Sequence, residues 1–232
     1  MGLLCLKGKE FRRSGNELKT KYYIWFKVAL FVLVLYLGET SNIVCLLQPS
    51  YVPIGSGRLH GSDQIYFVPL HTFPRSVLER FVDFYRNKYG LNISILPALS
   101  LPEQAFNKDR GQFVAEELIR QLERMSQASQ LESGSTIIAL TDRDIYIQEY
   151  TWRYAFSFRT GRLAVVSSAR MDHRFMGVWP IDQEWQETRL RKMVTKDIGV
   201  LYYDLPLSSH CRSPVFGRIG GPQELDFMGE DL

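Results

Sequence analysis

The chain has 232 residues, of which 45% are apolar and 23% charged, so it is composed like a globular protein and not like a disordered chain. Its net charge of +3 is concentrated at the start, where residues 1–21 carry six Lys or Arg against two Glu and Lys27 adds one more. The remainder has 21 basic and 23 acidic residues, which excludes a basic surface for nucleic acid.

Residues 22–38 form an apolar run with a single charge at Lys27. The run approaches the roughly 20 residues that cross a bilayer core. Lys27 can reach the headgroups, and Tyr22 and Trp25 are typical of membrane interfaces. We therefore expect a retained transmembrane helix; a cleaved signal peptide and a buried core helix are the alternatives. The expected anchor residues are Tyr22, Trp25, Lys27, Phe31 and Tyr36.

The flanking charges predict how this helix is oriented. The positive-inside rule places a basic tail, residues 1–21, in the cytoplasm and the globular part outside it, in the periplasm of a Gram-negative cell. The expected partners are the lipid bilayer and subunits of an integral membrane complex. Three cysteines are too few for a disulfide framework. Cys45 and Cys211 could pair, but unpaired thiols are favoured because their spacing demands no bridge.

Residues 39–62 are predicted to be a linker, because the second half of this segment is rich in Pro, Gly and Ser. A globular domain follows over residues 63–232. It opens with a buried-strand pattern that ends near Pro69. Residues 74–89 carry apolar side chains at helical spacing, and Gly90 is a natural helix stop.

The next segments alternate between the two types of secondary structure. Residues 91–96 have the period of a strand, residues 110–127 predict a second helix, and residues 135–140 predict a short buried strand. Two further extended runs follow at 144–147 and 152–159.

The domain is predicted to close with a hairpin and a third helix. A turn at Thr160 and Gly161 leads into an extended run over residues 162–168, and residues 184–203 have helical spacing. Strands and helices in this order predict an α/β or α+β domain, a mixed sheet with packed helices.

The last helix contains T-K-D-I-G-V, residues 195–200, which is similar in outline to the zinc helix of metalloproteases. In that helix two histidines one turn apart bind zinc, and a glutamate between them is the general base. Here Lys196 and Val200 stand at the histidine positions and Asp197 at the position of the base. Metzincins continue to a third histidine, and His210 resembles that end of the pattern.

The body of the chain resembles the archaemetzincin family over roughly residues 63–226. Besides the helix, the resemblance rests on the order and spacing of several segments. It implies a metzincin-like fold with an active-site helix under a mixed sheet. The segments are I-Y-F-V-P-L (65–70), D-R-G-Q-F-V-A-E-E-L (109–118), L-T-D-R-D-I-Y-I (140–147), F-S-F-R-T-G-R-L-A-V-V-S-S-A-R-M (156–171) and P-Q-E-L-D (222–226).

The departures from the family pattern concern the zinc ligands. A protonated lysine cannot ligate zinc, and valine has no donor atom. An alignment on His210 and Cys211 instead places Val200 and Asp204 at the first two ligand positions. In either alignment at most one or two of three ligands survive.

The second, structural zinc that the resemblance implies is held by cysteines, and only Cys211 matches that set. Phe216 stands near the place of another cysteine, and Arg218 near that of the Met-turn methionine. We therefore predict no catalytic residue, no bound metal and no cofactor, with Lys196, Asp197, Val200 and His210 as degenerate positions. Asp204, His210 and Cys211 are the weak candidate ligands.

These features lead to a functional hypothesis. We expect a membrane-anchored, catalytically inactive metzincin-like protein that is an accessory or structural subunit of a membrane complex, for instance a respiratory or photosynthetic one. One alternative is a pseudo-protease that binds peptides by strand addition at a sheet edge. Another is a hydrolase with a site rebuilt from Asp197, Asp204 and His210.

Overall fold

The computed structural model describes residues 45, 48, 51–52, 64–132, 134–172 and 183–232. The predicted basic tail and transmembrane helix lie outside these residues. Within the described part, no helix is both long and apolar enough to cross a membrane. The chain divides into two units, 1–47 and 48–232, and the fold below is that of the second.

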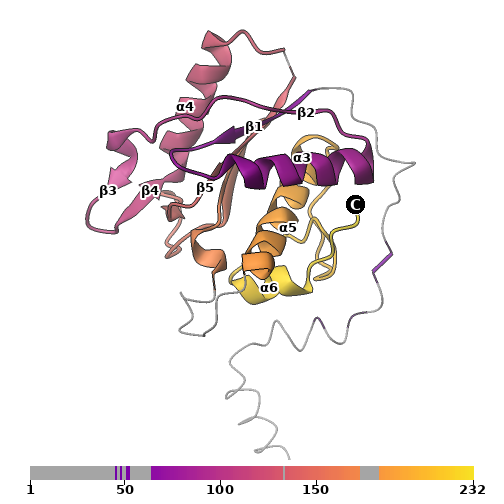
Figure 1. Cartoon of the computed structure of the whole chain (residues 1–232). Helices are drawn as coiled ribbons and strands as arrows, with labels where there is room; N and C mark the ends of the chain where they lie inside the picture. Colours follow the sequence, from indigo (N-terminus) through magenta and orange to yellow (C-terminus); the bar gives the residue numbers. More distant parts are fainter. Residues whose placement is uncertain (1–44, 46–47, 49–50, 53–63, 133, 173–182) are drawn as a thin grey trace, which may run out of the picture. The chain divides into compact units, whose positions relative to one another are not determined.

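A five-stranded mixed sheet forms the centre of the domain (Figure 1). Its strand order is β2-β1-β5-β8-β7, in which only the edge strand β7 runs antiparallel to its neighbour. All six residues of β5 are buried, as expected for a strand between parallel neighbours with helices on both faces. The strands are β1 (Ile65–Pro69), β2 (Ile93–Ile95), β5 (Thr136–Thr141), β7 (Ser157–Thr160) and β8 (Leu163–Ser167).

Helices cover both faces of this sheet (Figure 1). α3 (Arg75–Tyr89) and α5 (Gln183–Leu201) share one face, where the Tyr85 ring contacts Phe67 of the sheet and its hydroxyl hydrogen-bonds Thr195 of α5 at 2.9 Å. α4 (Ala115–Ala128) packs on the other face. Its buried side chains join those of the sheet in one core: Leu118, Ile119 and Leu122 with Val68, Ile137, Ala139 and Val165.

Most predicted elements are confirmed, including α3 with its left-handed stop at Gly90 and the tight hairpin between β7 and β8. The start of α4 was predicted wrongly, because residues 112–114 extend as a strand before the helix begins. Gly111, at φ 64°, makes the turn into that strand. The small sheet consists of β3 (Phe106–Asn107), β4 (Gln112–Val114) and β6 (Ile145–Tyr146).

Three short helices were not predicted from the sequence. They are the 3-10 turns η2 (Glu103–Ala105) and η3 (Ala169–Met171) and the helix α6 (Pro222–Phe227). Each spans six residues or fewer, so none shows an amphipathic period.

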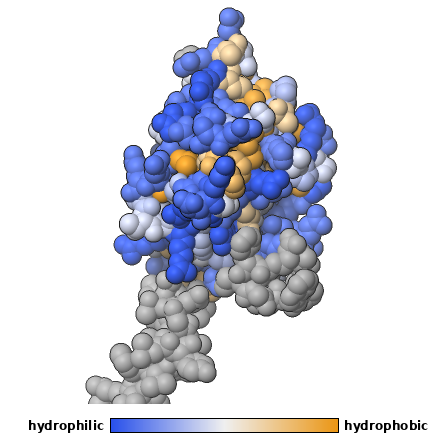
Figure 2. Space-filling model, turned by 90° about the vertical axis from the view of Figure 1, so that its left-hand side faces the viewer, coloured by the Kyte–Doolittle hydropathy of each residue, from blue (hydrophilic) through white to orange (hydrophobic). Residues whose placement is uncertain are grey.

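Figure 2 views the side of the molecule that carries β3 and β4, and apolar surface runs down it between hydrophilic regions. Phe106 of β3 is 41% exposed and lies against Phe113 of β4, with ring centroids 5.0 Å apart. The hollow beside them measures about 480 Å³. It is smaller and shallower than the cleft described next.

Candidate functional site

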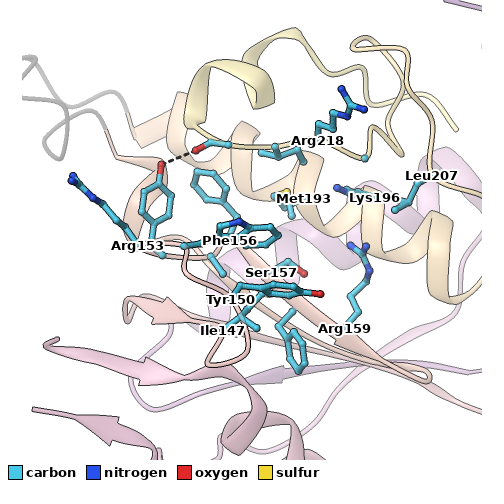
Figure 3. Close-up of a pocket in the computed structure, with 17 residues that line it drawn as sticks. Ile147, Tyr150, Arg153, Phe156, Ser157, Arg159, Met193, Lys196, Leu207 and Arg218 are labelled. Carbon is cyan, nitrogen blue, oxygen red and sulfur yellow. Dashed lines mark hydrogen bonds between the residues drawn. The ribbon is translucent and has the colours of Figure 1, made fainter. Parts of the chain in front are cut away.

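A cleft of about 810 Å³ lies between the edge of the main sheet and the segment that follows α5 (Figure 3). Residues 147–159 form one wall and residues 207–220 contribute the other. Met193 and Lys196 project from α5 between the two walls. Tyr154 donates a hydrogen bond to the carbonyl oxygen of Gly220 at 3.1 Å, which joins the walls at one end.

The packing of α5 against the segment after it depends on Gly199. A Cβ atom at this position would lie 2.7 Å from Cγ1 of Val215 and 2.8 Å from Cδ2 of Leu232. Side-chain atoms do not approach so closely without displacement. Gly199 therefore lets the segment that carries the second wall lie directly on the helix.

The charged residues of the cleft lining are all cationic. They are Arg153, Arg159, Lys196 and Arg218, and the lining contains no Asp or Glu. The guanidinium group of Arg153 points away from the cleft, whereas Arg159 extends from β7 toward Lys196 (Figure 3). A concave site lined by one sign of charge attracts the opposite charge, so this cleft favours anions.

Asp197, the residue after Lys196, is fully buried, and both of its carboxylate oxygens are engaged. Arg159 donates to Oδ1 at 2.8 Å and Ser157 donates to Oδ2 at 2.6 Å. A buried charge is stable only when it is paired and hydrogen-bonded. Asp197 thus ties α5 to β7 through an ion pair and a hydrogen bond.

Lys196 is 4% exposed, and its side chain lines the cleft. Its ammonium group forms no hydrogen bond or ion pair with another residue that the structure describes. Burial lowers the pKa of Lys196 to about 8; Asp197 opposes this shift and Arg159 adds to it. Of the degenerate positions and weak candidate ligands named from the sequence, it is the one that lines the cleft.

The other predicted positions lie elsewhere. Val200 and His210 do not line the cleft, and Nδ1 of His210 accepts a hydrogen bond from the Arg212 amide at 3.2 Å. Asp204 is exposed, at φ 52°, with its carboxylate 3.7 Å from Arg162. Within the described residues, no group of three or more His, Cys, Asp or Glu could hold a metal ion.

Cys45 and Cys211 are both disulfide-bonded. The expectation of unpaired thiols is therefore wrong. The error arose because the sequence spacing of two cysteines says nothing about their distance in space. A half-cystine has no thiolate to donate, which removes Cys211 from the candidate metal ligands.

Several residues of the cleft were not found from the sequence. Tyr150 and Trp152 stack with their ring centroids 4.5 Å apart, and they are 49% and 56% exposed. The sequence analysis assigned Trp152 and Arg153 only to an extended run, and it considered Arg218 only as a replaced methionine. The density of aromatic residues with arginine in W-R-Y-A-F-S-F-R was the signal that could have indicated a binding wall.

Comparison with known proteins assigns the fold. Residues 64–216 match the model of "Peptidase family M54". Archaemetzincin of Natronomonas pharaonis is 25% identical over 134 residues, 57% of this chain and 74% of that protein. Archaemetzincin of Pyrococcus horikoshii is 26% identical over 141 residues, 60% of this chain and 71% of that protein.

Solved structures show the same mixed α/β fold. Archaemetzincin of Methanopyrus kandleri superimposes with a TM-score of 0.58 at 24% identity and covers 78% of this chain and 92% of its own. Archaemetzincin of Archaeoglobus fulgidus, complexed with malonate, has a TM-score of 0.56 at 20% identity and covers 72% and 94%. The predicted fold class and family resemblance are confirmed at this level.

These matches contradict the functional hypothesis drawn from the sequence. They point to a peptidase family, and nothing in them indicates a subunit of a membrane, respiratory or photosynthetic assembly. The prediction of an accessory membrane subunit was therefore wrong. The two alternatives, a peptide-binding pseudo-protease and a rebuilt hydrolase, find no support in these matches either.

Proposed function

Since the chain belongs to peptidase family M54, we propose a function for the cleft over α5. It binds small organic carboxylates through Lys196 and Arg159, and it does so without zinc-dependent hydrolysis of peptides. The observation that carries this proposal is a buried lysine that no other described residue pairs with, in a cleft whose lining has no acidic side chain.

The charges within the cleft support an anionic ligand. Arg159 is compensated by Asp197, whereas no acidic residue of the lining compensates Lys196. Burying a charge without a partner is costly. A bound carboxylate would supply the missing partner, through charge-assisted hydrogen bonds that are stronger than neutral ones.

Zinc does not fit the residues present. An ion over this part of α5 would meet the ammonium group of Lys196, which repels it, and Val200 one turn further along has no donor atom. Asp197 already binds Arg159 and Ser157 with its two oxygens. The donor set therefore favours anions over cations.

Calorimetric titration of the full chain with malonate tests this proposal. Malonate is a suitable probe because the Archaeoglobus relative was crystallised with it. We expect one binding event per chain, weakened about tenfold or more by Lys196→Met, which removes a charge-assisted contact. Arg153→Gln is the matched control: it also removes one positive charge, but from a side chain that points away from the cleft.

Family membership favours a competing function, a zinc peptidase. That function predicts one zinc ion per chain and cleavage of peptide substrates that stops when a chelator is added. Elemental analysis and a peptidase assay on the same preparation distinguish the two. Stoichiometric zinc with chelator-sensitive cleavage would refute the proposal, and so would malonate binding that Lys196→Met leaves unchanged.

A further inference from the structure

Lys196 has the environment of a reactive amine as well as that of an anion-binding group. Its side chain is buried at the cleft and has no hydrogen-bond or ion-pair partner among the described residues. An amine in a cleft that no neighbouring residue engages can approach a ligand atom directly.

We propose that Lys196 condenses with the carbonyl group of a 2-oxo acid bound in the cleft and holds the ligand as an imine. This inference rests on the proposed function, because the carboxylate site is what would bring the carbonyl carbon to the amine. In a 2-oxo acid, the carbonyl carbon is bonded directly to a carboxylate carbon. A carboxylate held by Arg159, which extends toward Lys196 (Figure 3), would therefore place the carbonyl next to the amine.

The neighbouring charges allow the amine to be neutral. Burial is the main cause that lowers the pKa of Lys196 to about 8, and Arg159 from β7 lowers it further. Asp197, the adjacent carboxylate that opposes this, is bound to Arg159 and Ser157. Of the other charged lining residues, Arg218 is also cationic and Arg153 points away. At pH 7.4 about a fifth of such amines are unprotonated, against roughly a thousandth for an exposed lysine.

The reaction needs no oxidant, reductant or metal ion. The lone pair of Nζ attacks the carbonyl carbon, a C–N bond forms, and one proton passes from the nitrogen to the carbonyl oxygen to give a carbinolamine. The C–O bond then breaks, the hydroxyl leaves as water with the second proton of the nitrogen, and a C=N bond replaces the original C=O bond. In total, one amine and one carbonyl compound react to give one imine and one water molecule.

Lys192 provides a control on the same helix. Its pKa is also lowered, chiefly by burial, but its ammonium group donates to the carbonyl oxygens of Leu225 and Asp226 at 2.9 and 3.0 Å. It does not line the cleft. If partial burial alone made a lysine reactive, Lys192 would react as readily as Lys196.

The test is borohydride trapping on the full chain with 2-oxoglutarate, followed by intact-mass measurement and peptide mapping. We expect one adduct per chain, with the mass of the oxo acid less one oxygen atom, located on Lys196. Lys192→Arg leaves this adduct in place and Lys196→Arg abolishes it. Glutarate, which has the two carboxylates but no ketone, suppresses trapping in the unsubstituted protein, so the result does not depend on how the variants fold.

The outcomes separate this inference from the proposed function. If glutarate binds but 2-oxoglutarate leaves no adduct, the imine is wrong and the carboxylate site stands. If neither compound binds, both proposals fail. Adducts spread over several lysines, or an adduct on Lys196 that glutarate does not suppress, would show unspecific amine chemistry and overturn the inference.

Discussion

At the scale of single residues, Asp197 and Lys196 are neighbours in sequence with opposite environments. Asp197 is buried with two hydrogen-bond donors on its carboxylate, and Lys196 is buried without a partner among the described residues. Burial lowers the pKa of Lys196, since the ion is poorly solvated there. The two residues therefore predict different responses to substitution.

We expect Asp197→Asn to destabilise the fold by about 3 kcal/mol, because it leaves the buried end of the Arg159 pair without its counter-charge. Urea unfolding measures the change. The control is Asp83→Asn, in the exposed pair with Arg86, which should cost less than about 1 kcal/mol. Equal effects of the two substitutions would argue against a structural role for the buried pair.

The pKa of Lys196 predicts how ligand binding depends on pH. Because its folded pKa is about 8, malonate affinity should fall as the pH rises from 7 to 9.5 and the ammonium group loses its proton. In Lys196→Arg the charge persists, so affinity should stay nearly constant over that range. A parallel loss of affinity in both proteins would place the titrating group elsewhere.

The same pKa predicts the stability of the unbound protein. The folded pKa lies below the unfolded value of 10.5, so the unfolded state holds more protons between these two values. Stability contributed by residue 196 should therefore rise between about pH 8 and 10.5. The unsubstituted protein should have a lower free energy of unfolding than Lys196→Met, and this difference should shrink over that pH window. Urea unfolding at several pH values measures it.

At the scale of elements, local signals predicted most of the main sheet and the three long helices. α3 has regular apolar spacing and a glycine stop, and β7 and β8 are joined by a tight turn, so each is specified within a few residues. The start of α4 was missed because residues 112–114 pair with strands on both sides. Such pairing is tertiary and overrides helical spacing.

The cleft could not be predicted in the same way. Its walls are separated by about fifty residues or more in sequence, and the contact between α5 and the segment after it depends on a single glycine. T-K-D-I-G-V stood out in the sequence only because it is similar to a zinc helix. The sequence alone could not show that Lys196 faces a cavity while Asp197, the next residue, faces an arginine.

We expect Gly199→Ala to cost about 1 to 3 kcal/mol, because the added methyl group overlaps Val215 and Leu232 and must displace the second wall of the cleft. Malonate affinity should fall as well. For stability, Gly217→Ala is the control, since a Cβ there would meet its nearest neighbours at 3.5 Å, an ordinary contact. Equal melting temperatures for both variants and the unsubstituted protein would contradict this account.

At the scale of the whole molecule, the chain has the mixed α/β fold of archaemetzincins but a cleft whose charge suits anions. A fold is compatible with many activities, and the side chains of the site decide which one is present. The hypothesis of a membrane subunit was overturned by the match to a peptidase family. It was built on residues 22–38 and on absent ligands, neither of which describes what the cleft binds.

The most direct test of the central claim is a malonate titration of the full chain before and after exhaustive treatment with a zinc chelator. We predict the same affinity and one site per chain in both states, because Lys196 and Arg159 provide the binding groups. Binding that disappears with the chelator and returns when zinc is added would contradict the account, and would identify the cleft as a metal centre.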